Sequence, residues 1–366
     1  MRVAILGTRG IPARYGGFET FAEELSTRLA RRGHEVTVYC RQRHGAGAFR
    51  GVRLLYLPTL RTKHLDTLAH TLLSTLHLLW RRPDVALYCN AANAVFTPLA
   101  RLAGIPVALN VDGIERRRQK WSYPAKAWYL LSERLATFCP NAVVTDARTI
   151  QDYYLRHYRK PSRFIPYGAE TGRDAGTDTL RKLGLEPGEY FLYVSRMEPE
   201  NRALEVRQAF EQVKTEKKLA LIGDAPYARE YIRRVRDTRD PRIVIPGAIY
   251  GQGYRELGSH CFAYIHATEV GGTHPALIEA MGRAALVICR NTPENAEVAA
   301  GAAIFFEPGE LARMLELTLR MSEDERQRMR ARALERVRAQ YSWEAVTDAY
   351  ERLFEELHPP ARHNQK

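Results

Sequence analysis

Residues 262–282 read FAYIHATEVGGTHPALIEAMG, and this stretch decides the fold. Its apolar run, Phe262–Ala267, has the length and composition of a buried β-strand. A helical pattern begins at Pro275, a residue favoured in the first turn of a helix. Gly271, Gly272 and Thr273 form the turn between them. A buried strand, a glycine turn and a helix make up the repeating unit of a parallel sheet covered by helices.

The same unit recurs along the whole chain. Strand-like runs in the first half are Val3–Gly7, Val36–Cys40, Val52–Leu57, Val85–Cys89, Val107–Val111, Ala142–Thr145 and Arg163–Pro166. Those in the second half are Tyr190–Ser195, Leu219–Gly223, Ile243–Pro246, Phe262–Ala267, Leu286–Cys289 and Ala303–Phe306. Helical patterns such as Glu19–Arg32 and Ala125–Phe138 separate them. This alternation predicts an α/β protein with two Rossmann-like parallel sheets.

Domain boundaries follow from where the pattern stops and restarts. A length of 366 residues suits two domains. We expect the first over residues 1–170 and the second over residues 190–341, joined by a polar, glycine-rich linker over residues 171–189. Ser342 begins a last helix over residues 342–357, and the tail 358–366 is expected to be disordered. Ligands of such sheets bind beyond the carboxyl ends of the strands, so the cleft between the domains is the expected site.

Composition excludes several classes of protein. Hydrophobic residues make up 45% and charged residues 27% of the chain, which excludes bulk disorder. The five cysteines stand alone, so neither a disulfide framework nor a zinc site is predicted. The chain has no run of 18 apolar residues, and its N-terminus has the pattern of a first strand rather than of a signal peptide. We expect a cytoplasmic protein that binds no metal.

Positive charge is concentrated in the first half. Residues 1–170 hold 26 Lys and Arg against 12 Asp and Glu, whereas residues 171–366 hold 29 against 30. Such a field attracts an anionic membrane, nucleic acid or an anionic ligand, although a merely solubilising surface is an alternative. The basic residues are not interleaved with a nucleic-acid motif, so no nucleic-acid partner is predicted.

The glycine turn has the features of an anion site. N–H groups at Gly271, Gly272, Thr273 and His274 would meet the positive end of the next helix, which suits a diphosphate. Glu279 lies one turn further along an otherwise apolar helix, where its carboxylate can accept hydrogen bonds from a ribose diol. His274 is equally well interpreted as a cap or loop residue.

Other strands are also followed by candidate residues. The long turn after the first strand is either a binding loop or a simple tight turn, and it contains Arg9, Arg14, Tyr15, Gly16 and Gly17. It lacks the GxGxxG pattern, which disfavours an NAD-dependent oxidoreductase. Arg196 is either a phosphate ligand or a salt-bridged surface residue. Asp112 is a candidate whose alternative is a turn former, and Tyr250 is placed near a nucleotide base.

Four segments together resemble the nucleotide-sugar glycosyltransferases of glycosyltransferase family 4, which have the GT-B architecture. They are YGGFETFAEELSTRLARRGHEVTVYC from residue 15, SRMEPEN from 195, EVGGTHPALIEAM from 269 and YSWEAVTDAYERLFEEL from 341. GTRGIPARYGGFET and NVDGIERRRQKW are similar to a narrower branch that includes bacterial rhamnosyltransferases of cell-surface polysaccharide assembly. The resemblance covers residues 1–357 and implies two Rossmann-like domains facing a cleft, with the last helix crossing back onto the first.

The resemblance also implies a reaction. It is a retaining, metal-independent transfer of a sugar to a hydroxyl, with no cofactor. The narrower branch points to L-rhamnose from dTDP-rhamnose, transferred to a lipid-linked saccharide. UDP- or GDP-hexose donors, or an inactive nucleotide-sugar-binding homologue, are the alternatives. Phosphorylases are generally much longer, and we find none of the further acid–base residues of GT-B-like epimerases.

Residue roles follow from the same resemblance. The catalytic set is Asp112, Arg196 and Glu269. The donor-binding set is Gly16, Gly17, Arg196, Asn201, Arg202, Tyr250, Gly271, Gly272, Thr273, His274 and Glu279. The acceptor-binding set is Arg9, Arg14, Tyr15 and Gly16.

Two positions depart from the family's pattern. The paired glutamates of the family are eight residues apart, whereas Glu269 and Glu279 are ten apart, so Glu269 need not be the counterpart of the first one. Asn201 stands where the family has a lysine, and Arg202 is the expected replacement for its charge.

An anionic membrane surface is the last expected partner. Basic and aromatic residues cluster at Arg116, Arg117, Arg118, Lys120, Trp121, Lys126 and Trp128. The apolar helical pattern Leu65–Trp80 ends in Arg81 and Arg82. These features suit peripheral association with anionic lipid. For Leu65–Trp80, a core helix with a solvated basic end is the alternative.

Overall fold

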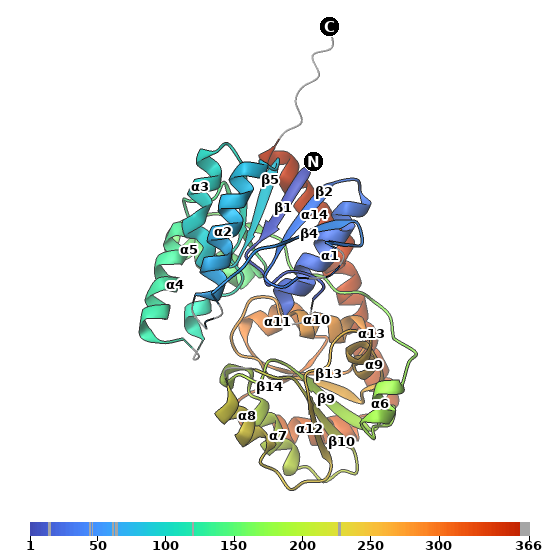
Figure 1. Cartoon of the computed structure of the whole chain (residues 1–366). Helices are drawn as coiled ribbons and strands as arrows, with labels where there is room; N and C mark the ends of the chain where they lie inside the picture. The colour runs from blue at the N-terminus through green and yellow to red at the C-terminus, as the bar shows by residue number, and fades with distance from the viewer. Residues whose placement is uncertain are drawn as a thin grey trace. The chain divides into compact units, whose positions relative to one another are not determined.

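The computed structural model describes residues 1–13, 16–43, 45, 47–60, 62, 65–118, 121–225 and 228–358. It contains two compact units, coloured along the chain in Figure 1. The first comprises Met1–Arg117, Trp121–Tyr167 and the segment from Trp343 onward. The second comprises Gly168–Ser342 together with Arg118.

In its described residues the first unit has a sheet of eight strands in the order β3-β4-β2-β1-β5-β6-β7-β8. The strands are β1 (Arg2–Leu6), β2 (Glu35–Cys40), β3 (Ala48–Phe49), β4 (Val52–Tyr56), β5 (Val85–Cys89), β6 (Val107–Asn110), β7 (Ala142–Thr145) and β8 (Arg163–Phe164). All pairings are parallel except that of β3 with β4. The sequence did not predict β3, since two residues are too few to show a period.

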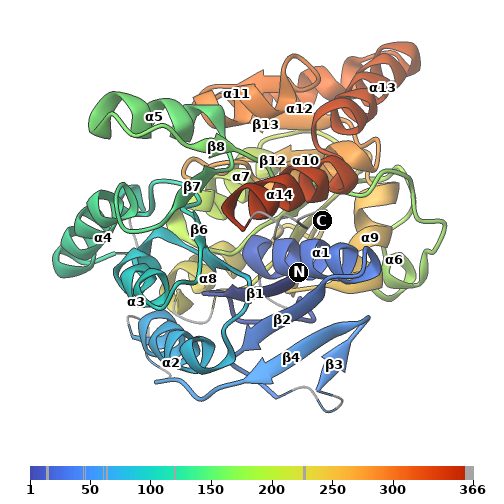
Figure 2. The ribbon, with the colours of Figure 1, turned by 90° about the horizontal axis from the view of Figure 1, so that it is seen from above.

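Helices of the first unit cover both faces of this sheet, as Figure 2 shows. They are α1 (Gly17–Arg31), α2 (Asp66–Arg81), η1 (Ala91–Phe96), α3 (Thr97–Leu102), η2 (Glu115–Arg117), α4 (Tyr123–Ala136), α5 (Arg148–Tyr158) and α14 (Trp343–Leu357). The central strand β5 is buried at every residue, as expected of a parallel strand with helices on both faces.

The second unit has a parallel sheet whose described strands run in the order β11-β10-β9-β12-β13-β14. The strands are β9 (Tyr190–Val194), β10 (Lys218–Ile222), β11 (Ile243–Gly247), β12 (Ala263–His266), β13 (Val287–Arg290) and β14 (Ile304–Phe306). The helices are α6 (Asp178–Lys182), η3 (Pro199–Asn201), α7 (Ala203–Glu211), α8 (Arg229–Arg236), α9 (Gly251–His260), α10 (Pro275–Gly282), α11 (Pro293–Ala299), α12 (Leu311–Arg320) and α13 (Glu323–Gln340). The predicted α/β class with two parallel sheets is confirmed.

The last helix belongs to the first unit, as the sequence predicted. α14 packs on α1, and the ring of Tyr350 lies 5.3 Å from that of Phe21. Asn110 Nδ2 donates to the Tyr350 hydroxyl at 3.0 Å, which ties α14 to the end of β6. On the outer side, Arg28 Nε and Arg32 Nη2 pair with Glu344 at 2.9 and 2.8 Å. The C-terminal helix is therefore a structural part of the first unit.

Residues 171–189 are not a free linker. They lie in the second unit, where α6 packs against α9 and Leu180 is fully buried. Thr179 N donates to the carboxylate of Glu256 at 2.7 Å. The composition of this segment suggested a linker because a single five-residue helix with one buried leucine leaves most side chains polar.

Truncation of α14 at its buried face should destabilise the first unit. Phe354 is fully buried, so Phe354→Ala should lower the free energy of unfolding by about 3–5 kcal/mol through lost contacts and a cavity. Chemical denaturation followed by circular dichroism measures this. Glu355→Ala, on the exposed side of the same helix, should change it by less than about 0.5 kcal/mol. Equal effects of the two substitutions would contradict the packing described.

Candidate functional site

The candidate site of the second unit lies at the point where its strand order reverses. β9 and β12 are neighbours, with β10 and β11 on one side and β13 and β14 on the other. Ligands of open parallel sheets bind beyond the carboxyl ends of the strands at such a point. The two loops that start there meet directly, because Glu269 N donates to the carbonyl of Glu200 at 3.1 Å. Residues 195–202 and 267–274 are thereby brought together.

Glu269 is held between two arginines. Arg202 Nε donates to Glu269 Oε2 at 2.8 Å, and Arg290, at the end of β13, pairs with Oε1. Arg290 Nη1 also reaches Glu205 at 3.1 Å. The positive charge of Arg202 is therefore balanced within the protein, whereas the sequence assigned that charge to the ligand. The carboxylate of Glu269 likewise orders the two loops.

Arg196 is placed at the carboxyl end of β9 beside a carboxylate. Its Nη2 atom lies 3.9 Å from Glu198 Oε2, and Arg118 Nη1 lies 4.0 Å from the same oxygen. Asn201 Nδ2 donates to the carbonyl of Arg196 at 2.6 Å and is buried, so Asn201 shapes this loop from within. In the sequence, Arg118 was noted only as part of a basic run. In the structure it belongs to the second unit and lies beside Glu198, so it is added to the site.

The glycine turn after β12 leads into α10 with His274 at the N-cap position. His274 Nδ1 lies 2.7 Å from Asn295 Oδ1, and its ring lies 5.0 Å from that of His266. Burial lowers the pKa of His274 to about 4 and that of His266 well below its usual value, so both imidazoles are neutral at pH 7. Gly272 and Thr273 are buried beside them. Asn295 was not predicted, because an asparagine one turn into a helix carries no sequence signal of its own.

Glu279 lies on α10 and contacts a tyrosine that the sequence did not single out. The Tyr254 hydroxyl donates to Glu279 Oε2 at 2.6 Å, and Arg283 lies over the Tyr254 ring at 5.5 Å. Tyr250, the predicted neighbour of the base, is the N-cap residue of α9 and is half exposed. Its spacing of four residues from Tyr254 along α9 is the signal that could have indicated the second tyrosine.

In the first unit the turn after β1 is fastened to α1. Arg9 N donates to Glu19 Oε1 at 2.9 Å, and Ala13 N donates to Glu23 Oε2 at 2.7 Å. Gly16 is the N-cap residue of α1, and Gly17 begins the helix. The carboxylates of α1 thus hold the backbone at Arg9 and Ala13. Arg14 and Tyr15 lie outside the described residues.

Asp112 follows β6 in a left-handed backbone conformation, with φ at +60°. Its N–H donates to Asn110 Oδ1 at 3.0 Å, and the Tyr167 hydroxyl donates to its Oδ1 at 3.3 Å. Aspartate adopts this conformation more readily than most residues, and the hydrogen bond from its N–H to Asn110 is typical of a turn. The backbone of Asp112 is therefore that of a turn former, and its carboxylate is held by Tyr167.

The basic run at residues 116–118 is not a free cationic patch. Arg116 Nε contacts Glu133 Oε1 at 3.1 Å, and Arg116 Nη2 donates to the Tyr153 hydroxyl at 2.7 Å. Trp121 Nε1 donates to Glu115 at 3.2 Å. Lys120 lies outside the described residues. Arg116 therefore serves the packing of η2 against α4 and α5, which removes it from the predicted membrane-binding cluster.

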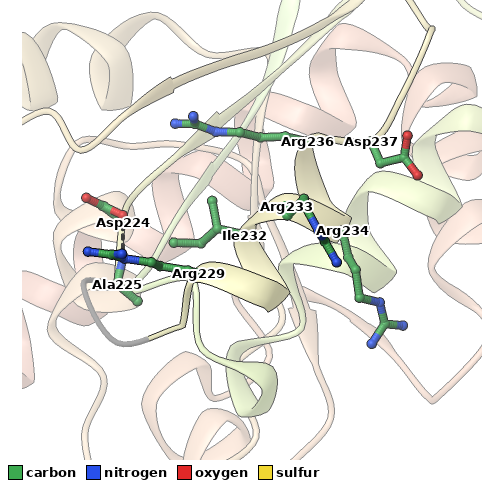
Figure 3. Close-up of a pocket in the computed structure, with 8 residues that line it drawn as sticks. All are labelled: Asp224, Ala225, Arg229, Ile232, Arg233, Arg234, Arg236 and Asp237. Carbon is green, nitrogen blue, oxygen red and sulfur yellow. Dashed lines mark hydrogen bonds between the residues drawn. The ribbon is translucent and has the colours of Figure 1, made fainter.

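A cavity of about 1080 Å³ lies beside the end of β10, and Figure 3 shows its lining. The described residues that line it are Asp224, Ala225, Arg229, Ile232, Arg233, Arg234, Arg236 and Asp237. They include none of the residues predicted for the site. Arg233 pairs with Glu230 at 2.8 Å, so part of the positive charge here is balanced locally.

Two features are absent from the described residues. These residues contain no group of three or more His, Cys, Asp or Glu side chains placed to hold a metal ion. No helix formed by these residues is both long enough and apolar enough to span a membrane.

Two family models match the chain, one in each unit. Residues 16–168 match the family model of the glycosyl transferase 4-like domain, and residues 188–324 match that of the glycosyl transferases group 1. No curated protein matches the chain by sequence.

Solved structures match over nearly the whole length. HepE of Anabaena in complex with UDP-glucose aligns with a TM-score of 0.79 and 14% identity, covering 96% of this chain and 99% of that one. Sucrose-phosphate synthase of Thermosynechococcus elongatus gives 0.77 and 18%, covering 97% and 98%. WaaG, a glycosyltransferase involved in lipopolysaccharide biosynthesis, gives 0.70 and 16%, covering 98% and 100%.

The two family models cover the two sheets in turn, and the solved structures match the chain over nearly its whole length. The chain is therefore a glycosyltransferase with the GT-B fold, built from a glycosyl transferase 4-like domain followed by a glycosyl transferases group 1 domain.

Proposed function

We propose that the protein is a retaining glycosyltransferase that moves a sugar from a nucleoside diphosphate to a hydroxyl group. The observation that carries the proposal is the grouping at one edge of the second sheet. Arg196 follows β9, the glycine turn follows β12, and Glu279 lies on the helix that this turn begins. A cation, a set of N–H groups and a carboxylate correspond to the diphosphate and the ribose of a nucleotide sugar.

The chemical task of this grouping is to stabilise the leaving group. As the bond to the sugar breaks, negative charge grows on the β-phosphate. The guanidinium of Arg196 and the N–H groups of residues 271–274 oppose that charge, together with the positive end of α10. In this proposal they act in place of a metal ion. Glu279, held by Tyr254, accepts hydrogen bonds from the ribose.

Retention of the sugar's anomeric configuration requires no protein nucleophile in this mechanism. The acceptor hydroxyl attacks on the face that the diphosphate leaves and gives its proton to a phosphate oxygen. In this proposal the carboxylate of Asp112 favours the positive charge that develops on the sugar ring. The family resemblance of residues 110–121 supports this role.

The narrower motifs extend the proposal to substrates. They favour dTDP-rhamnose as donor and a lipid-linked saccharide as acceptor, used at the cytoplasmic face of an anionic membrane. UDP- and GDP-hexoses are the alternative donors. HepE has been solved with UDP-glucose, which supports a UDP-hexose donor. WaaG is involved in lipopolysaccharide biosynthesis, which supports an acceptor of cell-surface polysaccharide assembly.

One observation favours a second candidate, an inactive nucleotide-sugar-binding homologue. Glu269 and Arg202 are engaged with each other, so neither charge is offered to a ligand in this arrangement. A donor would then be bound by Arg196, the glycine turn and Glu279, without the additional sugar contact that the family's first glutamate makes.

Substitution of the two main donor contacts tests catalysis. Arg196→Ala and Glu279→Ala should each lower kcat/KM at least about tenfold, which corresponds to about 1.4 kcal/mol of transition-state stabilisation. Release of nucleoside diphosphate from nucleotide sugars is the measurement. Arg313→Ala and Glu316→Ala remove the same charges from the surface of α12 and should leave the rate unchanged. Wild-type rates in both site variants would disprove the assignment.

A thermal-shift panel with dTDP, UDP, GDP, ADP and NAD identifies the base. A nucleotide at a hundredfold excess over its Kd stabilises the protein by about 2.7 kcal/mol. For a unit of this size the melting temperature should rise by about 5–10 °C with one nucleoside diphosphate. The shift should shrink in Glu279→Ala. If none of the nucleotides raises the melting temperature, the donor site is contradicted. A rise in melting temperature without turnover would support the inactive homologue.

A further inference from the structure

Helix α2 is built the opposite way round from an ordinary surface helix. The side chains that it buries are polar apart from one leucine: His70, Thr71, Ser74, Thr75 and Leu78. Its exposed large side chains, counting the N-cap residue, are apolar: Leu65, Leu72, Leu73, Leu76 and Trp80. These five follow the spacing of one helical face, and Trp80 is 74% exposed. The helix therefore presents a continuous apolar stripe on its outer side.

Helices α3 and α4 continue this arrangement. Leu99 and Leu102 are exposed on α3, the latter to 87%. On α4 the exposed large apolar residues are Tyr123, Leu130 and Leu131, with Phe138 just beyond the helix end. They recur at the same helical spacing as the stripe of α2, and Arg134 stands among them. Three successive helices thus expose apolar side chains that a soluble surface does not require.

The three helices lie on one side of the first unit. α2 contacts α3 and η1, and η1 contacts α4. Figures 1 and 2 both show α2, α3 and α4 grouped on the same flank of the first sheet. We call this flank the α2–α4 face, defined by Leu65, Leu72, Leu73, Leu76, Trp80, Leu99, Leu102, Tyr123, Leu130, Leu131 and Phe138.

The charge around the face is positive. Residues 65–138 contain five carboxylates, and each has a partner within the protein. Three are balanced by arginines, Asp66 by Arg41, Asp84 by Arg2 and Glu133 by Arg116. Asp112 and Glu115 accept hydrogen bonds from Tyr167 and Trp121 and keep their charge, but the same residues include nine Lys and Arg. By contrast, Arg81, Arg82, Lys126 and Arg134 pair with no carboxylate of the described residues. Arg81 lies over the ring of Trp80, 4.8 Å from its centroid.

We propose that the α2–α4 face docks on an anionic lipid bilayer. This partner rests on the proposed function, since a lipid-linked acceptor is presented at such a surface. Leucine, tryptophan, tyrosine and phenylalanine side chains enter the interfacial region, while neighbouring lysines and arginines reach the lipid phosphates. A second copy of this chain is a poorer partner, because two identical positive faces repel each other. The uneven charge of the two halves of the chain agrees with a single face turned to the membrane.

Flotation with phosphatidylcholine vesicles, with and without phosphatidylglycerol, tests the proposal. Wild-type protein should float with the anionic vesicles, less so at high salt, and hardly with the neutral ones. Leu76→Asp combined with Leu131→Asp should weaken the partitioning at least tenfold. Leu317→Asp is the matched control: Leu317 lies on α12 and is 44% exposed, against 51% for Leu76, and its substitution should change nothing. Arg81→Gln with Arg134→Gln should weaken binding and reduce its dependence on salt.

The melting temperature and the release of nucleoside diphosphate are measured separately from vesicle binding. Each variant should keep the wild-type melting temperature and its shift with the nucleoside diphosphate, which shows that the fold and donor site are intact. Vesicle binding without release of nucleoside diphosphate from any nucleotide sugar would refute the proposed function and leave the docking face in place.

Two results would overturn the docking face. One is equal flotation of the wild type and Leu76→Asp/Leu131→Asp. The other is absence of flotation together with a dimer, seen by sedimentation velocity, that the same double variant dissociates.

Discussion

The close approach of Gly271 to His274 is the constraint on which the second unit's site depends. A Cβ atom at position 271 would lie 2.2 Å from His274 Nε2, far inside van der Waals contact, so any other residue requires the imidazole to shift. That shift would disturb the contact of His274 with Asn295, which is itself fully buried. Asn295 Nδ2 donates to the carbonyls of Thr268 and Arg290 at 3.0 Å each, which leaves its Oδ1 facing the histidine. The turn, the start of α10 and the end of β13 are thus linked through one amide.

A buried polar group also ties separate elements together in the first unit, where it joins η2, α4 and α5. Glu133 is buried and accepts hydrogen bonds from Tyr153 and Tyr158 at 2.9 and 3.0 Å while it pairs with Arg116. Removing one member of such a network leaves a buried charge without compensation, so η2 has few alternative positions on α4 and α5. Burial and the neighbouring Tyr153 raise the pKa of Tyr158, which keeps its hydroxyl a donor to Glu133 across the ordinary pH range.

How much the sequence could reveal differs between fold and site. Strand positions were predictable because parallel strands covered on both faces are continuous apolar runs, as in β5 and β9. Arg196, Glu279 and the glycine turn could be found because each follows such a run. The ion-pair and hydrogen-bond partners of the site residues were not predictable in the same way. That Arg202 and Arg290 both pair with Glu269 depends on two loops and a strand end meeting in space, and no local pattern encodes it. Asn295 was missed for the same reason.

Helix α2 shows that a periodic pattern predicts a helix without fixing which side of it is buried. Helical spacing of leucines ordinarily marks the buried side. On the opposite, buried side, two of the three buried hydroxyls have partners, whereas Thr71 Oγ1 has none. Ser74 Oγ and Thr75 Oγ1 donate to the carbonyls of His70 and Thr71 at 2.7 and 2.8 Å, and Thr75 Oγ1 also lies 2.9 Å from the Tyr88 hydroxyl. Burying Ser74 and Thr75 therefore carries little penalty, and the leucines need not face the core. Burial lowers the pKa of His70 to about 4, so it too enters the interior uncharged at pH 7. The choice of buried side is thus a tertiary property, set by what β5 offers to α2 rather than by the hydrophobicity of the helix itself.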